Sequence, residues 1–147
     1  MTVLRLDNVG IVVDDLPAAV AFFLELGLSV EGEATVEGEL VDRLVGLEDV
    51  RSDIVMMKTP DGHGRLELSK FHHPAAVAGT HNAPVNTLGI GRIMFAVDDI
   101  DATVARLHAR GGELVREIVQ YENSHRLCYM RGPEGVLVAL AQPLVSG

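Results

Sequence analysis

The pattern of apolar and polar positions along this chain occurs twice, about 84 residues apart. Residues 8–20 read NVGIVVDDLPAAV, and residues 92–104 read RIMFAVDDIDATV. Each copy is an apolar run that ends in two aspartates, an aliphatic residue and the start of an amphipathic helix. A single repeat of this length is typical of two copies of one supersecondary unit, since a solenoid needs three or more shorter repeats.

The first half contains alternating or continuous apolar runs and one helical pattern. Apolar residues at helical spacing predict a helix over Leu16–Leu26, with Asp15 as N-cap and Gly27 as the stop signal. The polar segment 38–49 is expected to be a loop with a helical turn. The apolar runs predict strands at about 3–13, 28–36, 51–58 and 64–70.

The second half repeats this order. We predict a helix at about 100–110, ended by Gly111 and Gly112. The intervening segment, about 72–88, has two prolines and little periodicity, and we interpret it as a linker between module one (about 3–70) and module two (about 89–142). Each module is then a βαβββ unit. The predicted strands of the second half lie at about 91–97, 113–120, 126–131 and 135–141.

The composition is that of a folded globular chain. The chain has 147 residues, of which 48% are hydrophobic, so it can bury a sizeable core within one domain. No apolar run approaches the roughly 20 residues that cross a bilayer, and residues 1–10 lack the features of a signal peptide. The single cysteine, Cys128, fits a reducing compartment. We therefore expect a cytoplasmic protein without membrane contact.

The net charge of −9 disfavours nucleic acid as a partner. Phosphate binding needs clustered Lys and Arg, and the 12 basic residues of this chain are scattered. The acidic balance is explained by solubility, although an excess of carboxylates also favours a cationic ligand.

These features resemble the vicinal oxygen chelate superfamily, which includes glyoxalase I, extradiol dioxygenases and bleomycin-resistance proteins. The resemblance rests on the two VDD-(L/I) motifs and on the segments GRLELSKF and YMRGPEGVLVAL, and it covers about Val3 to Gln142. It implies an α+β fold in which tandem βαβββ modules form a curved mixed sheet around a cup. It also implies one domain of this family over residues 1–147 and a homodimer.

Enzymes of this superfamily hold a divalent metal through the first and last strands of each module. The resemblance places these ligand positions at Asn8, Glu67, Arg92 and Ala139. Alanine has no donor atom, and a guanidinium has no lone pair and repels a cation. We therefore predict no metal site and no cofactor. An ion pair between Glu67 and Arg92, with a hydrogen bond from Asn8, is expected in its place.

Other candidate site residues lie in and after the polar segment YENSHR. Tyr121, His125 and Arg126 are predicted to bind ligand near the mouth of the cup. Strand alternation places Arg126, Cys128 and Met130 on one face and Leu127 and Tyr129 on the other. If the first set faces the cup, Arg126 is a second anchor for an anionic or carbonyl group. The adjacent His72 and His73 should point apart and are interpreted as surface residues.

Three hypotheses about function remain open. The favoured one is metal-independent binding of a small molecule, an antibiotic or a metabolite, in the cup. The second is a glyoxalase- or epimerase-type lyase or isomerase, in which Glu67 acts as general base and Arg92 or Arg126 polarises a carbonyl substrate. The third is a structural dimer module without ligand. The sequence has no nucleophile motif, phosphate-binding loop or paired cysteines with zinc spacing.

Overall fold

The structure, a computed structural model, describes residues 2–144. The chain divides into two compact units, Met1–Ala78 and Gly79–Gly147, and each is described here by itself. Within the described residues, no helix has both the length and the apolar character needed to span a membrane.

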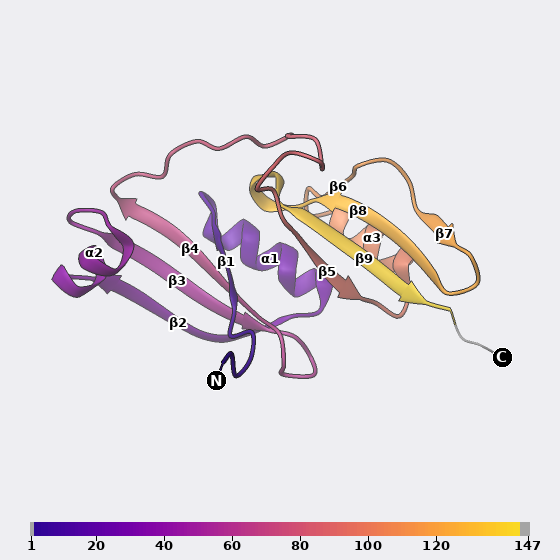
Figure 1. The fold of residues 1–147 in the computed structure, drawn as a ribbon, viewed down its shortest axis with the longest axis horizontal. Coiled ribbons are helices and arrows are strands. Elements are labelled where there is room, and N and C mark those ends of the chain that lie inside the picture. Colours follow the sequence, from indigo (N-terminus) through magenta and orange to yellow (C-terminus); the bar gives the residue numbers. More distant parts are fainter. Residues whose placement is uncertain (1, 145–147) are drawn as a thin grey trace. The chain divides into compact units, whose positions relative to one another are not determined.

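Unit 1 is a four-stranded mixed sheet with a helix packed on one face (Figure 1). The strand order is β1-β4-β3-β2; β1 runs parallel to β4, and the other pairs are antiparallel. A second, short helix follows β2. The elements are β1 (Val9–Val12), α1 (Leu16–Leu26), β2 (Ser29–Glu37), α2 (Glu39–Val45), β3 (Arg51–Lys58) and β4 (Arg65–His73).

Helix α1 has the limits that its sequence predicts. The side chain of Asp15 accepts a hydrogen bond from the backbone N–H of Ala18, and Gly27 ends the helix in the left-handed conformation. On its buried face, Phe22 and Phe23 make an edge-to-face contact with ring centroids 5.1 Å apart. These rings form the core of unit 1 together with the buried side chains Leu66, Leu68, Met57, Val55 and Ile11.

Unit 2 has the same architecture. Its strand order is β5-β9-β8-β6, with β7 also paired to β8, and β5 runs parallel to β9. Helix α3 begins at an N-cap, Asp99, that corresponds to Asp15 of unit 1. The elements are β5 (Arg92–Ala96), α3 (Ile100–His108), β6 (Glu113–Leu114), β7 (Val119–Tyr121), β8 (His125–Arg131), the 3-10 turn Pro133–Gly135 and β9 (Leu137–Pro143).

The predicted fold class is confirmed, since both units are mixed α+β modules of the expected element order. Two strand predictions were wrong in extent. Residues 3–8 form no strand, because β1 pairs with β4 only from Val9 onwards. The predicted strand 113–120 is split into β6 and β7: Leu114 pairs with Met130 but Val119 with Leu127, so the residues between them bulge out of the ladder.

Candidate functional site

The sheet of unit 1 has two chemically different faces. In β4, the side chains of Leu66 and Leu68 are buried on the face that carries α1. Because side chains alternate along a strand, Glu67 points to the opposite face. Gly10 pairs with Glu67, so Asn8, two residues earlier, belongs to this opposite face as well. Asn8 and Glu67, two of the positions that the resemblance assigns to metal ligands, therefore share a face of unit 1.

Glu67 has unused hydrogen-bonding capacity within the described part of the chain. Its side chain is half-buried and makes no hydrogen bond or ion pair with any described residue of unit 1. The neighbour across the ladder is Met56, which cannot neutralise a carboxylate. Its predicted partner Arg92 belongs to unit 2, so the Glu67–Arg92 ion pair stays a prediction.

In unit 2, Arg92 is held by an aromatic side chain. Its Nε donates to the hydroxyl oxygen of Tyr129 over 2.6 Å, and its guanidinium carbon lies 5.6 Å from the centroid of that ring. Ala139 pairs with both Met94 and Tyr129 and is completely buried between them. Arg92, Tyr129 and Ala139 therefore lie on the face opposite α3.

Arg126 lies on the other face of the same sheet. Its two terminal nitrogens donate to the carboxylate of Asp101, in α3, over 2.6 and 3.1 Å. This hydrogen bonding holds the pKa of Asp101 below its usual range. The alternation predicted for β8 is correct, but the face that carries Arg126 is the one against α3. The condition for Arg126 to act beside Arg92 is therefore not met.

Tyr121 and His125 share the face of Arg92 and Tyr129. They form a cross-strand pair between β7 and β8. His125 and Tyr129 are four residues apart in β8, so their side chains lie on the same face. Tyr121 is exposed and His125 is partly buried. Arg92, Tyr121 and His125 thus share a face of unit 2, but the register places them near opposite ends of the sheet, since Arg92 is level with Leu137 and His125 with Pro143. Arg126 lies on the other face.

Two of the four positions that the resemblance assigns to metal ligands carry no donor for a metal in this chain. Ala139 has no lone pair to donate, and Arg92 is a permanent cation already engaged with Tyr129. Only Glu67 supplies a strong ligand, and Asn8 only a weak carbonyl oxygen, whereas a catalytic site uses about three protein ligands. The described residues also contain no group of three or more His, Cys, Asp or Glu side chains able to hold a metal.

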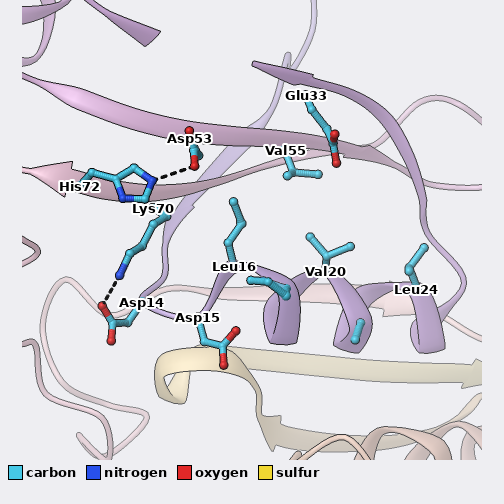
Figure 2. Close-up of a pocket in the computed structure, with 12 residues that line it drawn as sticks. Asp14, Asp15, Leu16, Val20, Leu24, Glu33, Asp53, Val55, Lys70 and His72 are labelled. Atoms are coloured by element: carbon cyan, nitrogen blue, oxygen red, sulfur yellow. Dashed lines mark hydrogen bonds and ion pairs between the residues drawn. The ribbon is translucent and has the colours of Figure 1, made fainter. Parts of the chain in front are cut away.

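A pocket of about 770 Å³ lies within unit 1, on the face of the sheet that carries α1 (Figure 2). The sequence reasoning missed it, although the signal was present. Alternation in RLELSKFH places Lys70 and His72 on the same face as Leu68, and a second apolar stripe runs beside the buried stripe of α1. We call this cavity the helix pocket. It is lined by Asp14, Asp15, Leu16, Pro17, Val20, Ala21, Leu24, Glu33, Asp53, Val55, Lys70 and His72.

Two polar clusters border the helix pocket. Asp53 accepts hydrogen bonds from the hydroxyl of Thr35 (2.7 Å) and pairs with Nε2 of His72 (2.7 Å); these bonds lower the pKa of the Asp53 carboxyl. Lys70 donates to Asp14 over 2.8 Å and lowers the pKa of that carboxyl. His72 and His73 do point to different partners, since His73 Nδ1 bonds to the backbone oxygen of Asp49.

Comparison with known proteins assigns the chain to a family. The model of the Glyoxalase/Bleomycin resistance protein/Dioxygenase superfamily matches residues 5–140, so the chain belongs to that superfamily. A glyoxalase family protein of Bacillus cereus is 54% identical, with a TM-score of 0.94 over 99% of this chain and 97% of that one. No curated protein matches the sequence.

More distant structures share the fold alone. A glyoxalase family protein of Enterococcus faecalis is 19% identical, with a TM-score of 0.63 over 94% of this chain and 97% of that one. The trypanothione-dependent glyoxalase I of Leishmania major is 18% identical, with a TM-score of 0.65 over 94% of this chain and 86% of that one.

Proposed function

We propose that this superfamily member binds a small molecule without a metal, and that Arg92 anchors an anionic or carbonyl oxygen of the ligand. The observation that carries the proposal is the placement of Arg92. Its Nε is fixed by Tyr129, while its terminal N–H groups have no partner among the described residues. A guanidinium oriented in this way is suited to receive a carboxylate or a polarised carbonyl.

The surroundings of Arg92 support a ligand site. Tyr129 offers an aromatic surface beside Arg92, and its neighbour across the ladder, Ala139, is apolar. His125 and Tyr121 add two polar groups on the same face, toward the other end of the strands. An apolar surface with a few oriented polar groups is typical of small-molecule sites.

Thermal unfolding in the presence of candidate ligands tests this proposal. The screen compares carboxylates, glutathione hemithioacetals and natural-product antibiotics, each with EDTA and with Mg²⁺, Mn²⁺, Ni²⁺ or Zn²⁺. A ligand at 100 times its Kd stabilises by about 2.7 kcal/mol, which raises the Tm by roughly 5–10 °C in a chain of this size. We expect the shift to be equal with and without metal.

Matched variants show whether Arg92 is the anchor. Arg92→Gln should abolish most of the shift, whereas Arg116→Gln, an exposed arginine of the same unit, should leave it unchanged. A shift that requires metal, or that survives in Arg92→Gln, would contradict the proposal.

Glu67 supports a second candidate function, proton abstraction next to a carbonyl. Its half-buried carboxylate has no side-chain partner among the described residues of unit 1 and is therefore available there as a general base. The test is exchange of substrate protons for deuterium, followed by NMR, with methylglyoxal–glutathione hemithioacetal as the probe. Exchange that is lost in Glu67→Gln would favour the enzyme, and its absence in the parent protein would favour binding alone.

The assembly and location that we propose follow from the family and the composition. We propose a cytoplasmic homodimer, because the superfamily commonly completes its cups in dimers and the single cysteine suits a reducing compartment. Light scattering of the purified protein would give its mass, and a mass of one chain would reject the dimer.

A further inference from the structure

The helix pocket is separate from the site proposed above. All its lining residues belong to unit 1, and they lie on the face of the sheet covered by α1. Glu67 points to the opposite face of this sheet, and Arg92 belongs to unit 2. The volume of about 770 Å³ lies within the range of roughly 300–1,000 Å³ typical of small-molecule sites. Its chemistry can therefore be considered independently.

One wall of the helix pocket is a continuous aliphatic stripe. Leu16, Val20 and Leu24 follow each other at four-residue spacing along α1 and point toward the sheet (Figure 2). At a rise of 1.5 Å per residue, the stripe is about 12 Å long. Val55 of β3 faces it from the other side. Leu24 remains 49% exposed, so an apolar ligand chain would bury surface that the protein itself leaves in water.

The charged groups of the helix pocket favour a cation. Four carboxylates line it, against one lysine. Three of the four are engaged: Asp14 with Lys70, Asp15 with the backbone N–H of Ala18, and Asp53 with Thr35 and His72. Lys70 is therefore already neutralised by its neighbour, and it offers little to an anionic ligand.

Glu33 is the carboxylate that remains. It extends from β2, next to Val55 in the ladder, and it makes no side-chain hydrogen bond or ion pair with any described residue. Figure 2 shows its side chain above the end of the stripe formed by Val20 and Leu24. The carboxylate of Glu33 thus lies beside the exposed aliphatic surface of Leu24. This combination is complementary to an amine that carries an apolar chain.

We propose that the helix pocket binds a primary amine with an aliphatic body. The ammonium group pairs with Glu33, and the chain lies along Leu16, Val20 and Leu24 against Val55. An anion of the same shape is rejected by the surplus of carboxylates. This inference does not depend on the proposed function, because the two sites share no residue.

Methyl NMR with octylammonium as the probe tests the proposal, with octanoate and octanol as matched controls. Methyl groups report the face directly, because each points to one side of the sheet. We expect octylammonium to shift the methyl signals of Leu16, Val20, Leu24 and Val55. Those of Val12 and Ile54, on the face opposite α1, should stay unchanged. Octanoate should bind at least about tenfold more weakly.

Charge variants separate a specific anchor from general attraction to an acidic protein. An ion pair near the surface contributes up to about fivefold in affinity, so Glu33→Gln should weaken octylammonium binding by about that factor. Glu48→Gln, which removes an exposed carboxylate of the same unit outside the helix pocket, should have no effect. Leu24→Ser should weaken octylammonium and octanol alike.

Three results would overturn the proposal. They are equal affinity for octanoate, an equal loss in Glu33→Gln and Glu48→Gln, and methyl shifts at Val12 and Ile54 in place of the stripe. Because Glu33 and Leu24 are both exposed, circular dichroism is expected to show all variants folded. Failure of the Arg92 experiments would leave these results unaffected.

Discussion

Arg92 donates from Nε to the hydroxyl of Tyr129, and its guanidinium carbon lies 5.6 Å from the centre of the same ring. Both contacts orient the cation, but neither neutralises it, since a phenol carries no charge at neutral pH. A positive group is thus held on the face of unit 2 opposite α3.

Tyr129→Phe should destabilise the protein modestly. The change removes the acceptor for Nε but keeps the aromatic ring, so the expected loss is about 0.5–1.5 kcal/mol, the contribution of one hydrogen bond. Urea unfolding measures it. The matched control is Tyr121→Phe, because Tyr121 is 61% exposed and its hydroxyl has no partner among the described residues. Equal effects of the two changes would contradict the assigned bond.

Leu68→Ala should be strongly destabilising. Leu68 is completely buried on the α1 face of β4, and its truncation leaves a cavity in the core of unit 1. Substitutions of this kind cost about 2–5 kcal/mol. Leu40→Ala in α2 is the control, since Leu40 is 78% exposed and should change the unfolding free energy by less than about 0.5 kcal/mol. A loss below about 1 kcal/mol for Leu68→Ala would show that the core is packed differently.

Gly135→Ala should be more harmful than Gly111→Ala. Both glycines have positive φ, 75° and 90°, so each alanine bears the strain of the left-handed region, about 1 kcal/mol. A Cβ at Gly135 would also overlap the backbone of His81, whereas at Gly111 it meets nothing. Thermal unfolding of the two variants measures the difference. Identical Tm values would mean that the chain near His81 does not pack on this turn.

Cys128 should be unreactive in the folded protein. Burial raises the pKa of its thiol to about 11, and the side chain is 4% exposed, so little thiolate is present at pH 8. Ellman's reagent should react slowly with the native protein and rapidly in urea. Rapid reaction without denaturant would place the thiol in a more exposed environment.

Asp53 should contribute to the pH dependence of stability in acid. Hydrogen bonds from Thr35 and then His72 lower the pKa of its carboxyl below the reference value of 3.8. Its contribution is therefore complete above about pH 4 and is lost as the pH falls through the lower folded-state pKa. The difference in unfolding free energy between the parent protein and Asp53→Asn should shrink across this range.

The control for this titration is Asp98→Asn. Asp98 is exposed and has no side-chain partner among the described residues, so this change removes a carboxylate without breaking a hydrogen bond. If Asp98→Asn and Asp53→Asn reduce the loss of unfolding free energy at acidic pH equally, the hydrogen bonds of Asp53 do not stabilise the fold.

The sequence alone determined helices α1 and α3 and most strands, because their signals are local, whereas α2 lies where a loop with a helical turn was expected. The limits of α1 follow from two local signals. The side chain of Asp15 accepts a backbone hydrogen bond in the first turn, and Gly27 ends the helix in the left-handed conformation. Period-two alternation likewise predicted which residues of β8 share a face. Local signals were insufficient where pairing with another strand decides the structure, as in the bulge between Leu114 and Val119.

Only the tertiary structure decided which face each side chain meets. Alternation places Arg126 and Tyr129 on opposite faces of β8, but it does not predict which of these faces α3 covers. That depends on where the helix packs. The helix pocket has the same origin, since Leu24 and Glu33 come together only when α1 crosses beside β2 and β3. The sequence determined that Arg92 and Ala139 cannot bind a metal, because donor chemistry is a property of the residue itself. What Arg92 contacts instead is a property of the fold, because Tyr129 reaches it only across the strands of unit 2.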